Sequence, residues 1–212
     1  MFFKKKKYKL LKKDKIKYDG KTLYRIKALK SFGVIKKGTK GGYIENERNL
    51  SQNGNCWIMY LGRVYENARV FNDALVLEGK IHGNALIDCN ALVDGRYCEI
   101  CGKTHITDYS KVFNNAKISG NVCVRGSACI TTNAKLLTDD DYAIIQGFGR
   151  DNRITTFYRS RKGGIWVECG CFNGNLSEFR DQVKNTHKEG SQHRKEYLEI
   201  ANLMERRFKY RV

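Results

Sequence analysis

A six-residue pattern repeats along the middle of the chain, from residue 54 to residue 138. In each repeat a large aliphatic residue, at a position termed i, follows a small or medium residue at position i−2. The large residues are Ile58, Val64, Val70, Val76, Ile81, Ile87, Val93, Ile100, Ile106, Val112, Ile118, Val124, Ile130 and Leu136, with Ile81, Ile87 and Val93 one residue early. Fourteen successive repeats exceed what chance would supply.

This spacing predicts a mainly β fold, a parallel solenoid of short strands. Residues i−2 and i of a strand point to the same face, so each repeat places one large and one small side chain in a narrow core. Asparagine often precedes the small residue, and asparagine tolerates the left-handed backbone conformation that a corner requires. These asparagines are Asn55, Asn67, Asn84, Asn90, Asn115, Asn121 and Asn133. Three strands and corners make one coil of about 18 residues, so four to five coils are expected.

The pattern resembles the hexapeptide-repeat left-handed β-helix, in which Val or Ile is followed four residues later by Ala, as in Val64–Ala68 and Val112–Ala116. The left-handed sense follows from this resemblance, because crossovers between parallel strands are normally right-handed. A right-handed solenoid of the bactofilin kind is the alternative. The whole chain also resembles uncharacterised phage and prophage proteins of this architecture, at Gly41–Glu45 and Cys169–Phe172. That resemblance indicates a source rather than an activity.

The repeat divides the chain into three parts: a basic N-terminal arm and cap (1–50), the β-helix (51–141) and a small α+β unit (142–212). Alternating residues predict strands at 22–29 and 31–35, which would cap the exposed end of the solenoid. In the C-terminal unit, a hairpin is expected at Arg153–Tyr158 and Ile165–Cys169 around Lys162–Gly164. A helix capped by Ser177 should then run to about His187.

A second helix is expected at about 192–208, with one apolar side formed by Tyr197, Ile200, Ala201 and Met204. Hexapeptide-repeat proteins of this type are often trimers whose C-terminal helices pack between subunits. The resemblance therefore implies a homo-oligomer, a trimer or a dimer. Tyr197, Ile200 and Met204 are the interface that we predict for it.

Positive charge is concentrated at the two ends of the chain. The formal net charge is +18, and residues 1–40 carry 15 lysines and Arg25 against two aspartates. Clustered lysines attract phosphate polymers or acidic protein surfaces, and they would contact the phosphate backbone without sequence preference. The alternative is a solvated face that keeps the protein soluble. The binding candidates are Lys4, Lys5, Lys6, Lys7, Lys12 and Lys13.

A second basic candidate lies in the C-terminal unit, where arginines alternate with aromatic residues. Arginine beside aromatic side chains suits bases and phosphates, in single strands or in free nucleotides. The alternative is an exposed basic hairpin without a ligand. The candidate residues are Arg153, Arg159, Arg161 and Trp166, close in sequence to Arg150, Phe157 and Tyr158.

No catalytic residue stands out, and His82 and His105 are the candidates that the repeat offers. Acyltransferases of the β-helix kind use a histidine between coils as general base and take an acyl-CoA. Those enzymes usually extend a long loop over the acyl carrier, and this repeat has no such insertion. The triplet Gly102–Thr104 is not a phosphate-binding loop, because Tyr97 stands where that motif needs glycine. The pair Gly147 and Gly149 lacks the third glycine of a dinucleotide fingerprint.

Cysteine and histidine suggest two metal candidates without a familiar zinc spacing. The first is Cys169 and Cys171 with His187 and His193 on later helices, a set that could also pair a thiol nucleophile with a base. In the second, Cys98 and Cys101 precede His105, but Cys98 occupies a small inward position of the repeat. Core packing is the favoured interpretation of that pair, and no cofactor is expected.

The N-terminus places apolar residues before Lys4–Lys7, the reverse of a signal peptide, and no apolar run is long enough to span a membrane. We therefore expect the eight cysteines to stay reduced in a bacterial host cytoplasm. Three functions remain open: a non-enzymatic phage-type binding protein, an acyltransferase, and a structural or virion component. The binding protein would engage nucleic acid, a nucleotide or a host nucleoprotein complex, for example as an inhibitor of bacterial antiviral defence.

Overall fold

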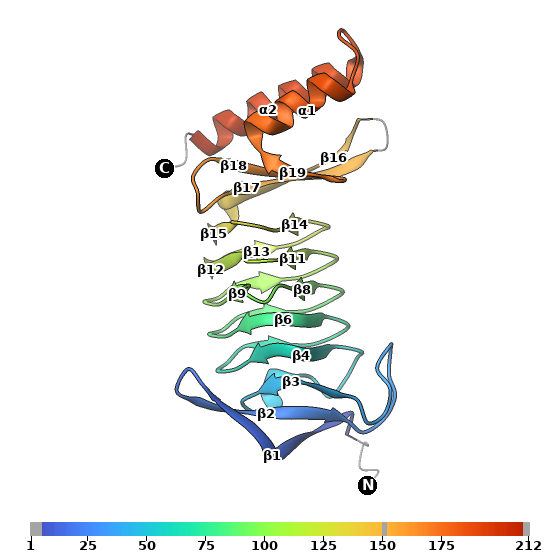
Figure 1. Ribbon diagram of the computed structural model, residues 1–212, viewed down its shortest axis with the longest axis vertical. Helices are drawn as coiled ribbons and strands as arrows, with labels where there is room; N and C mark the ends of the chain where they lie inside the picture. Colours follow the sequence, from blue (N-terminus) through green and yellow to red (C-terminus); the bar gives the residue numbers. More distant parts are fainter. Residues whose placement is uncertain (1–5, 150–151, 210–212) are drawn as a thin grey trace.

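Short parallel strands stack on three faces in the middle of the computed structural model, which describes residues 6–149 and 152–209 (Figure 1). The first face contains β4 (Trp57–Val64), β6 (Leu75–Ile81), β8 (Leu92–Asp94), β11 (Lys111–Phe113) and β14 (Cys129–Ile130). The second contains the C-terminal halves of β4 and β6 with β9 (Glu99–Ile100), β12 (Lys117–Asn121) and β15 (Lys135–Thr138). The third contains β5 (Arg69–Val70), β7 (Leu86–Ile87), β10 (His105–Ile106) and β13 (Cys123–Val124). Together they make a parallel β-solenoid of about five turns, as predicted.

The solenoid core consists of the residues that the repeat selected. All fourteen large aliphatic residues are at most 1% exposed, and the small residues at i−2 are buried beside them. The three early residues are accommodated by coil length rather than by a loop: Arg63 pairs with Lys80 seventeen residues on, and Lys80 pairs with Glu99 nineteen residues on. The coil of 17 residues and the coil of 19 residues compensate each other, so the large aliphatic residues continue to point into the core.

The left-handed corner residue lies at i+2, one position before the predicted asparagine. Glu66 and Asp108 have positive φ there (both 57°), and Gly83, Gly102 and Gly120 occupy the same position elsewhere. Of the predicted asparagines, Asn133 adopts this conformation, with φ 63°. The predicted asparagines lie at i+3, where the side chain can link neighbouring coils, as in the 3.1 Å hydrogen bond from Asn67 to Asn84.

The N-terminal end is a long antiparallel hairpin joined to the first coil. It consists of β1 (Tyr8–Tyr18) and β2 (Lys21–Ala28), and β3 (Lys40–Ile44) pairs antiparallel to β2 and parallel to β4. The strand predicted at 31–35 is wrong, because Phe32 and Ile35 form an isolated bridge inside a tight loop. Ile44 and Leu50 are fully buried and pair with Val64 and Val70, so the first coil begins before the repeat becomes regular.

Side chains satisfy the backbone groups that the two solenoid edges would otherwise leave unpaired. At the N-terminal edge, the buried Lys7 ammonium donates to the carbonyls of Asn53, Gly54 and Cys56. At the C-terminal edge, oxygen atoms of the next segment accept from coil N–H groups: Asp139 from Cys123, Tyr142 from Arg125, Thr156 from Cys129 and Tyr158 from Thr131. Each edge is thereby closed against further strand pairing.

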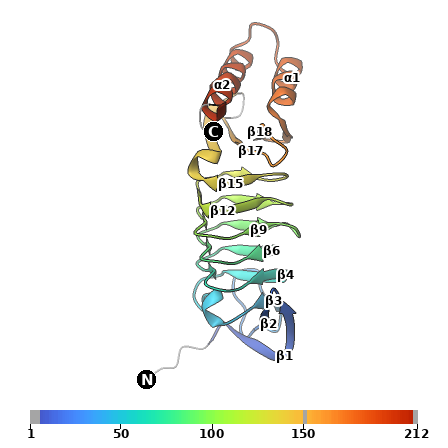
Figure 2. The same ribbon diagram turned by 90° about the vertical axis from the view of Figure 1, so that its left-hand side faces the viewer.

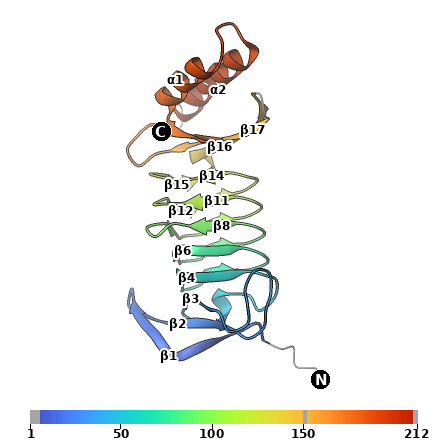
Figure 3. The same ribbon diagram turned by 45° about the vertical axis from the view of Figure 1, so that its right-hand side comes forward.

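A four-stranded antiparallel sheet lies across the C-terminal end of the stack, with both helices on its far side (Figures 2 and 3). Its strands are β16 (Tyr142–Phe148), β17 (Arg153–Arg159), β18 (Ile165–Cys169) and β19 (Phe172–Asn175), followed by α1 (Leu176–Thr186) and α2 (Gln192–Lys209). The predicted hairpin is β17–β18. The cap of α1 is Asn175 rather than Ser177, because the Asn175 side chain accepts from the Glu178 N–H in a reciprocal capping box.

The apolar side of α2 packs inside its own chain. Tyr197, Ile200, Ala201 and Met204 are at most 8% exposed and form one core with Phe179 and its neighbours on α1 and the sheet. The prediction that Tyr197, Ile200 and Met204 form a subunit interface is therefore wrong for this structure. No helix in the described part of the chain has the length and apolar character needed to cross a bilayer.

A half-buried carboxyl group marks the junction between the last coil and the C-terminal sheet. Thr131, Tyr158 and Asn173 all donate hydrogen bonds to Oε1 of Glu168. Burial raises the pKa of Glu168, and these three donors offset part of that rise. The protonated form is thus favoured more in the folded protein than in the unfolded chain.

Replacing Glu168 with Gln should remove a pH dependence of stability. Because the folded-state pKa of Glu168 is raised, its contribution to the free energy of unfolding is fully present below about pH 4 and is lost as pH rises through the folded-state pKa. Relative to Glu168→Gln, the wild type should therefore lose stability between about pH 4 and neutrality. Urea unfolding across this range measures the difference, and a constant difference would contradict the prediction.

Candidate anion-binding sites

Lysines line the outermost strand at the N-terminal end of the molecule. We define the lysine surface as Lys9, Lys12, Lys13, Lys15 and Lys17, all exposed and all on β1. β1 ends the strand order of its sheet and pairs with β2 on both sides of an irregularity between Leu11 and Lys15. Lys9, Lys15 and Lys17 lie in the paired stretches, and Lys12 and Lys13 lie in the irregularity. Lysine on an edge strand also discourages pairing with another chain, and that protective role is the structural alternative to binding.

Positive charge on this surface is little neutralised. Asp14, the one acidic residue of β1, faces Arg25 (Nε–Oδ2 3.1 Å) and Lys40 (Nζ–Oδ2 3.4 Å). Desolvation works against the ionisation of Asp14, but hydrogen bonds and charges from Arg25 and Lys40 outweigh it and lower the pKa. Lys12 lies 4.4 Å from the centre of the Tyr24 ring, a cation–π contact that orients its ammonium group.

The remaining N-terminal candidates do not share the lysine surface. Lys4 and Lys5 lie outside the described residues. Lys6 pairs with Glu47 at 2.8 Å. Lys7 is 1% exposed and, besides its carbonyl contacts, lies 3.2 Å from the Cys56 sulfur. Burial lowers the pKa of Lys7, so its prediction as an external phosphate contact is wrong: this side chain closes the solenoid edge.

The arginines predicted in the C-terminal unit do not form one cluster with aromatic residues. Arg153 and Arg159 lie at opposite ends of β17, and Arg150 is outside the described residues. Arg161 donates to the carbonyl of Asn115, on the side of the solenoid. Trp166 is partly buried and donates to Asn173. The neighbouring Phe157 and Tyr158 rings are fully buried, so they offer no stacking surface for a base.

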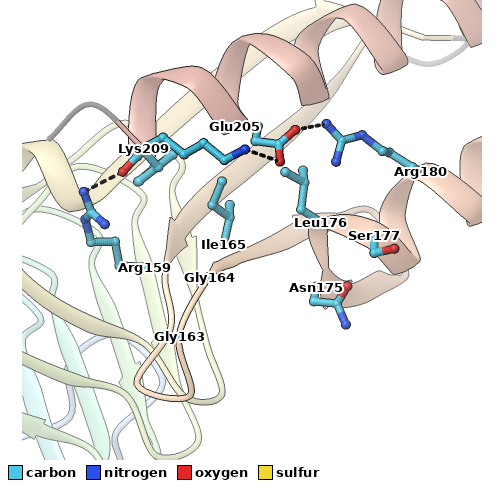
Figure 4. Close-up of a pocket in the computed structure, with 11 residues that line it drawn as sticks. Arg159, Gly163, Gly164, Ile165, Asn175, Leu176, Ser177, Arg180, Glu205 and Lys209 are labelled. Carbon is cyan, nitrogen blue, oxygen red and sulfur yellow. Dashed lines mark hydrogen bonds and ion pairs between the residues drawn. The ribbon is translucent and has the colours of Figure 1, made fainter. Parts of the chain in front are cut away.

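Arg159 lines a cavity of about 490 Å³ that we call the basic pocket (Figure 4). The pocket lies between the β17–β18 turn, the start of α1 and the end of α2. Its charged lining residues are Arg159, Arg180, Glu205 and Lys209, and its apolar lining residues are Ile165, Leu176 and Phe208. The lining therefore combines three cations and one carboxylate with an apolar part, which we call the apolar floor and which consists of Ile165, Leu176 and Phe208.

Ion pairs set the geometry of the basic pocket. Oε2 of Glu205 lies 2.7 Å from Arg180, and Oε1 lies 3.1 Å from Lys209. The hydrogen bonds from Arg180 and Lys209 lower the pKa of Glu205, which stays ionised. Arg159 pairs with Asp141 at 2.9 Å and donates to the carbonyl of Phe208, whose ring lies under the guanidinium group. Sequence reasoning identified Arg159 but missed Arg180 and Lys209.

Cys169, Cys171 and His187 do come together, as lining residues of a smaller cavity of about 140 Å³ beside Arg153 and Tyr197. The His187 ring packs against Tyr197 and lies 6.0 Å from the His193 ring, centre to centre. Across residues 6–149 and 152–209, however, no three His, Cys, Asp or Glu side chains are arranged as ligands of one metal ion.

The second cysteine candidate is part of the solenoid core. Cys98 is fully buried, and burial raises the pKa of its thiol to about 12. Burial also raises the pKa of the Cys101 thiol. A metal ligand or nucleophile must be a thiolate, so both cysteines are poorly suited to that role.

Both candidate histidines lie against carboxylates of adjacent coils. His82 lies between Glu66 (Nδ1–Oε2 3.7 Å) and Glu99 (Nε2–Oε1 3.4 Å) and stacks on the Tyr65 ring. His105 places Nε2 3.1 Å from Oδ1 of Asp88. A carboxylate beside a histidine can orient a general base, yet neither histidine lines either cavity described above.

The chain matched no known protein family, and a comparison with curated proteins found no relative.

Proposed function

We propose that the protein is a non-enzymatic binding protein that engages nucleic acid through its lysine surface. The observation that carries this proposal is the gathering of five exposed lysines on one strand that is joined through β2 and β3 to the solenoid. Nucleic-acid affinity without sequence preference arises mainly from lysine and arginine contacts with phosphates. Lysines on a backbone that is already ordered as a strand lose less conformational entropy on binding than those of a disordered arm would.

The phage-type resemblance extends this proposal to a source and a role. In this view the solenoid is a left-handed β-helix of the hexapeptide-repeat kind, and it acts as a rigid spacer between two basic ends. The partner would be nucleic acid, a nucleotide or a host nucleoprotein complex in the bacterial cytoplasm. Inhibition of bacterial antiviral defence by occlusion is the corresponding role, with the protein acting as a dimer or trimer.

Acyl transfer is the alternative function, and the histidine–carboxylate contacts are what favour it. His82 and His105 would act as candidate general bases toward an acyl-CoA. The successive strands of the solenoid are joined by short corners, which offer no long loop to enclose an acyl carrier. Calorimetric titration with acetyl-CoA separates the two functions. Saturable binding of acetyl-CoA that persists after Lys→Gln changes on the lysine surface would support the enzyme. If the protein is instead a structural or virion component, the third function, it should bind neither nucleic acid nor acetyl-CoA.

The test of nucleic-acid binding is a salt series with a Lys→Gln variant of all five residues of the lysine surface. Each phosphate contact on duplex DNA contributes about −0.9 to the slope of log affinity against log salt. Five lost contacts should therefore reduce the slope by about 4 to 5 and weaken binding strongly at low salt. Fluorescence anisotropy with two unrelated duplexes measures both quantities and should show the same loss for each.

The matched control replaces Lys111, Lys117 and Lys135 with Gln. These lysines are also exposed but stand on the solenoid, away from β1. The control should keep the wild-type slope. If the five-residue variant binds both duplexes with unchanged affinity and slope, the lysines protect a strand edge and the proposal is wrong.

A further inference from the structure

We infer that the basic pocket is a second, separate binding site, which takes a small phosphate monoester with an apolar or aromatic substituent. This site lies at the opposite end of the solenoid from the lysine surface (Figure 1). Its volume of about 490 Å³ falls within the range of small-molecule sites, about 300 to 1,000 Å³. The pocket is too small for a duplex and large enough for a single nucleotide or an aryl phosphate.

The charge of the lining favours an anion. Arg159, Arg180 and Lys209 come from β17, α1 and α2, and Glu205 is the one carboxylate among the lining residues. Asp141 pairs with Arg159 from outside the lining, so three cations and two carboxylates leave a net charge of +1, which favours a bound phosphate. Arginine at two of the three positions suits phosphate, because a guanidinium group presents several donors in one plane.

Glu205 already shows how an anion is held there. Its two oxygens are divided between Arg180 and Lys209, the arrangement that two phosphate oxygens would adopt (Figure 4). Arg180 donates from Nη2 to both Asn202 and Glu205, and its guanidinium group carries further N–H donors that a ligand could use. A ligand phosphate would share the donors of Arg180 and Lys209 with the Glu205 carboxylate.

The apolar floor selects an organic phosphate over inorganic phosphate. Ile165, Leu176 and Phe208 line the same cavity as the cations. Phe208 is 4% exposed and packs under Arg159, so it forms a fixed wall rather than a mobile side chain. A ring placed on this wall would gain apolar contact that inorganic phosphate lacks.

The test is calorimetric titration of the full chain with phenyl phosphate, adenosine monophosphate, inorganic phosphate and phenol. Phenyl phosphate should bind saturably and at least tenfold more tightly than inorganic phosphate, and phenol should not bind. Tighter binding of adenosine monophosphate than of phenyl phosphate would identify a nucleotide as the source of the phosphate. Arg180→Gln and Lys209→Gln should each weaken phenyl phosphate binding about tenfold or more, whereas Glu205→Gln should strengthen it.

Lys184→Gln is the matched control, because Lys184 is an exposed cation of α1 outside the pocket. This variant should bind as the wild type does, and circular dichroism confirms that each variant is folded. The five-residue variant of the lysine surface should also keep phenyl phosphate binding, so failure of the proposed function leaves this site intact. Absence of saturable binding by either organic phosphate, or binding that neither Arg180→Gln nor Lys209→Gln weakens, would overturn the inference.

Discussion

Replacing Val112 with Asp should destabilise the solenoid by at least about 4 kcal/mol, enough to abolish cooperative folding of the central coils. Val112 is fully buried in β11, where it pairs with Val93 on one neighbouring coil and Ile130 on the other. A carboxylate at this position would be surrounded by aliphatic side chains without a partner. Because each coil of a solenoid contacts only its neighbours, a defect in one coil interrupts the core on both sides.

Thermal unfolding followed by circular dichroism measures this effect. Lys111→Asp is the matched control, because Lys111 precedes Val112 on the same strand and is exposed. It introduces the same carboxylate on the outer face, and its effect on stability should stay within about 0.5 kcal/mol. If Val112→Asp melts like the wild type, the assignment of inward residues is wrong.

The central fold could be predicted because each repeat carries its own structural signal. Val112 and Ala116 are assigned to the core by a pattern that fourteen repeats reinforce, so an irregular repeat such as that of Ile81 does not obscure it. The first coil, which contains Ile44 and Leu50, has no such run of regular repeats. A 3-10 helix at Glu47–Asn49 lies between Ile44 and Leu50, and an irregular loop separates Leu50 from Ile58. Two repeats alone do not exceed chance.

Neighbouring residues of the same type have different roles where tertiary contacts determine which of them is buried. Lys6 and Lys7 are neighbours in a lysine run, yet one pairs with Glu47 on the surface and the other is buried beneath the first coil. Lys6 and Lys7 directly precede β1, and Lys7 is the one covered because its ammonium group reaches the carbonyls of the loop at Asn53–Cys56. Sequence periodicity carries no information about that contact.

The same limit applies to the C-terminal unit. The helical period located the apolar side of α2, but a 3.6-residue pattern does not say whether its partner is the same chain or another. The basic pocket is built by Arg159, Arg180 and Lys209, which come from three elements with no common spacing. Arg159 was identified through its local arginine cluster. The other two could be found only once the helices were placed over the sheet.

Close stacking of the solenoid corners should make Gly95→Ala more damaging than a glycine substitution in strained backbone. A Cβ at Gly95 would lie 2.6 Å from both the amide nitrogen and the carbonyl carbon of Asn114, in the coil above, and closer still to its carbonyl oxygen. These are backbone atoms, and the Asn114 N–H is already bound to the Asp94 carbonyl, so the corner cannot yield without breaking that contact. We expect a cost of about 3 kcal/mol.

Gly126→Ala separates this steric effect from backbone strain. Gly126 has φ +68°, and the nearest atom to an added Cβ is Ile144 Cδ1 at 3.5 Å, an ordinary contact. An alanine there carries the left-handed backbone penalty alone, roughly 1 to 2 kcal/mol. Urea unfolding of both variants should therefore rank Gly95→Ala as the less stable. If Gly126→Ala is instead the less stable variant, the coils at the Gly95 corner must lie farther apart than the close approach of Gly95 to the Asn114 backbone indicates.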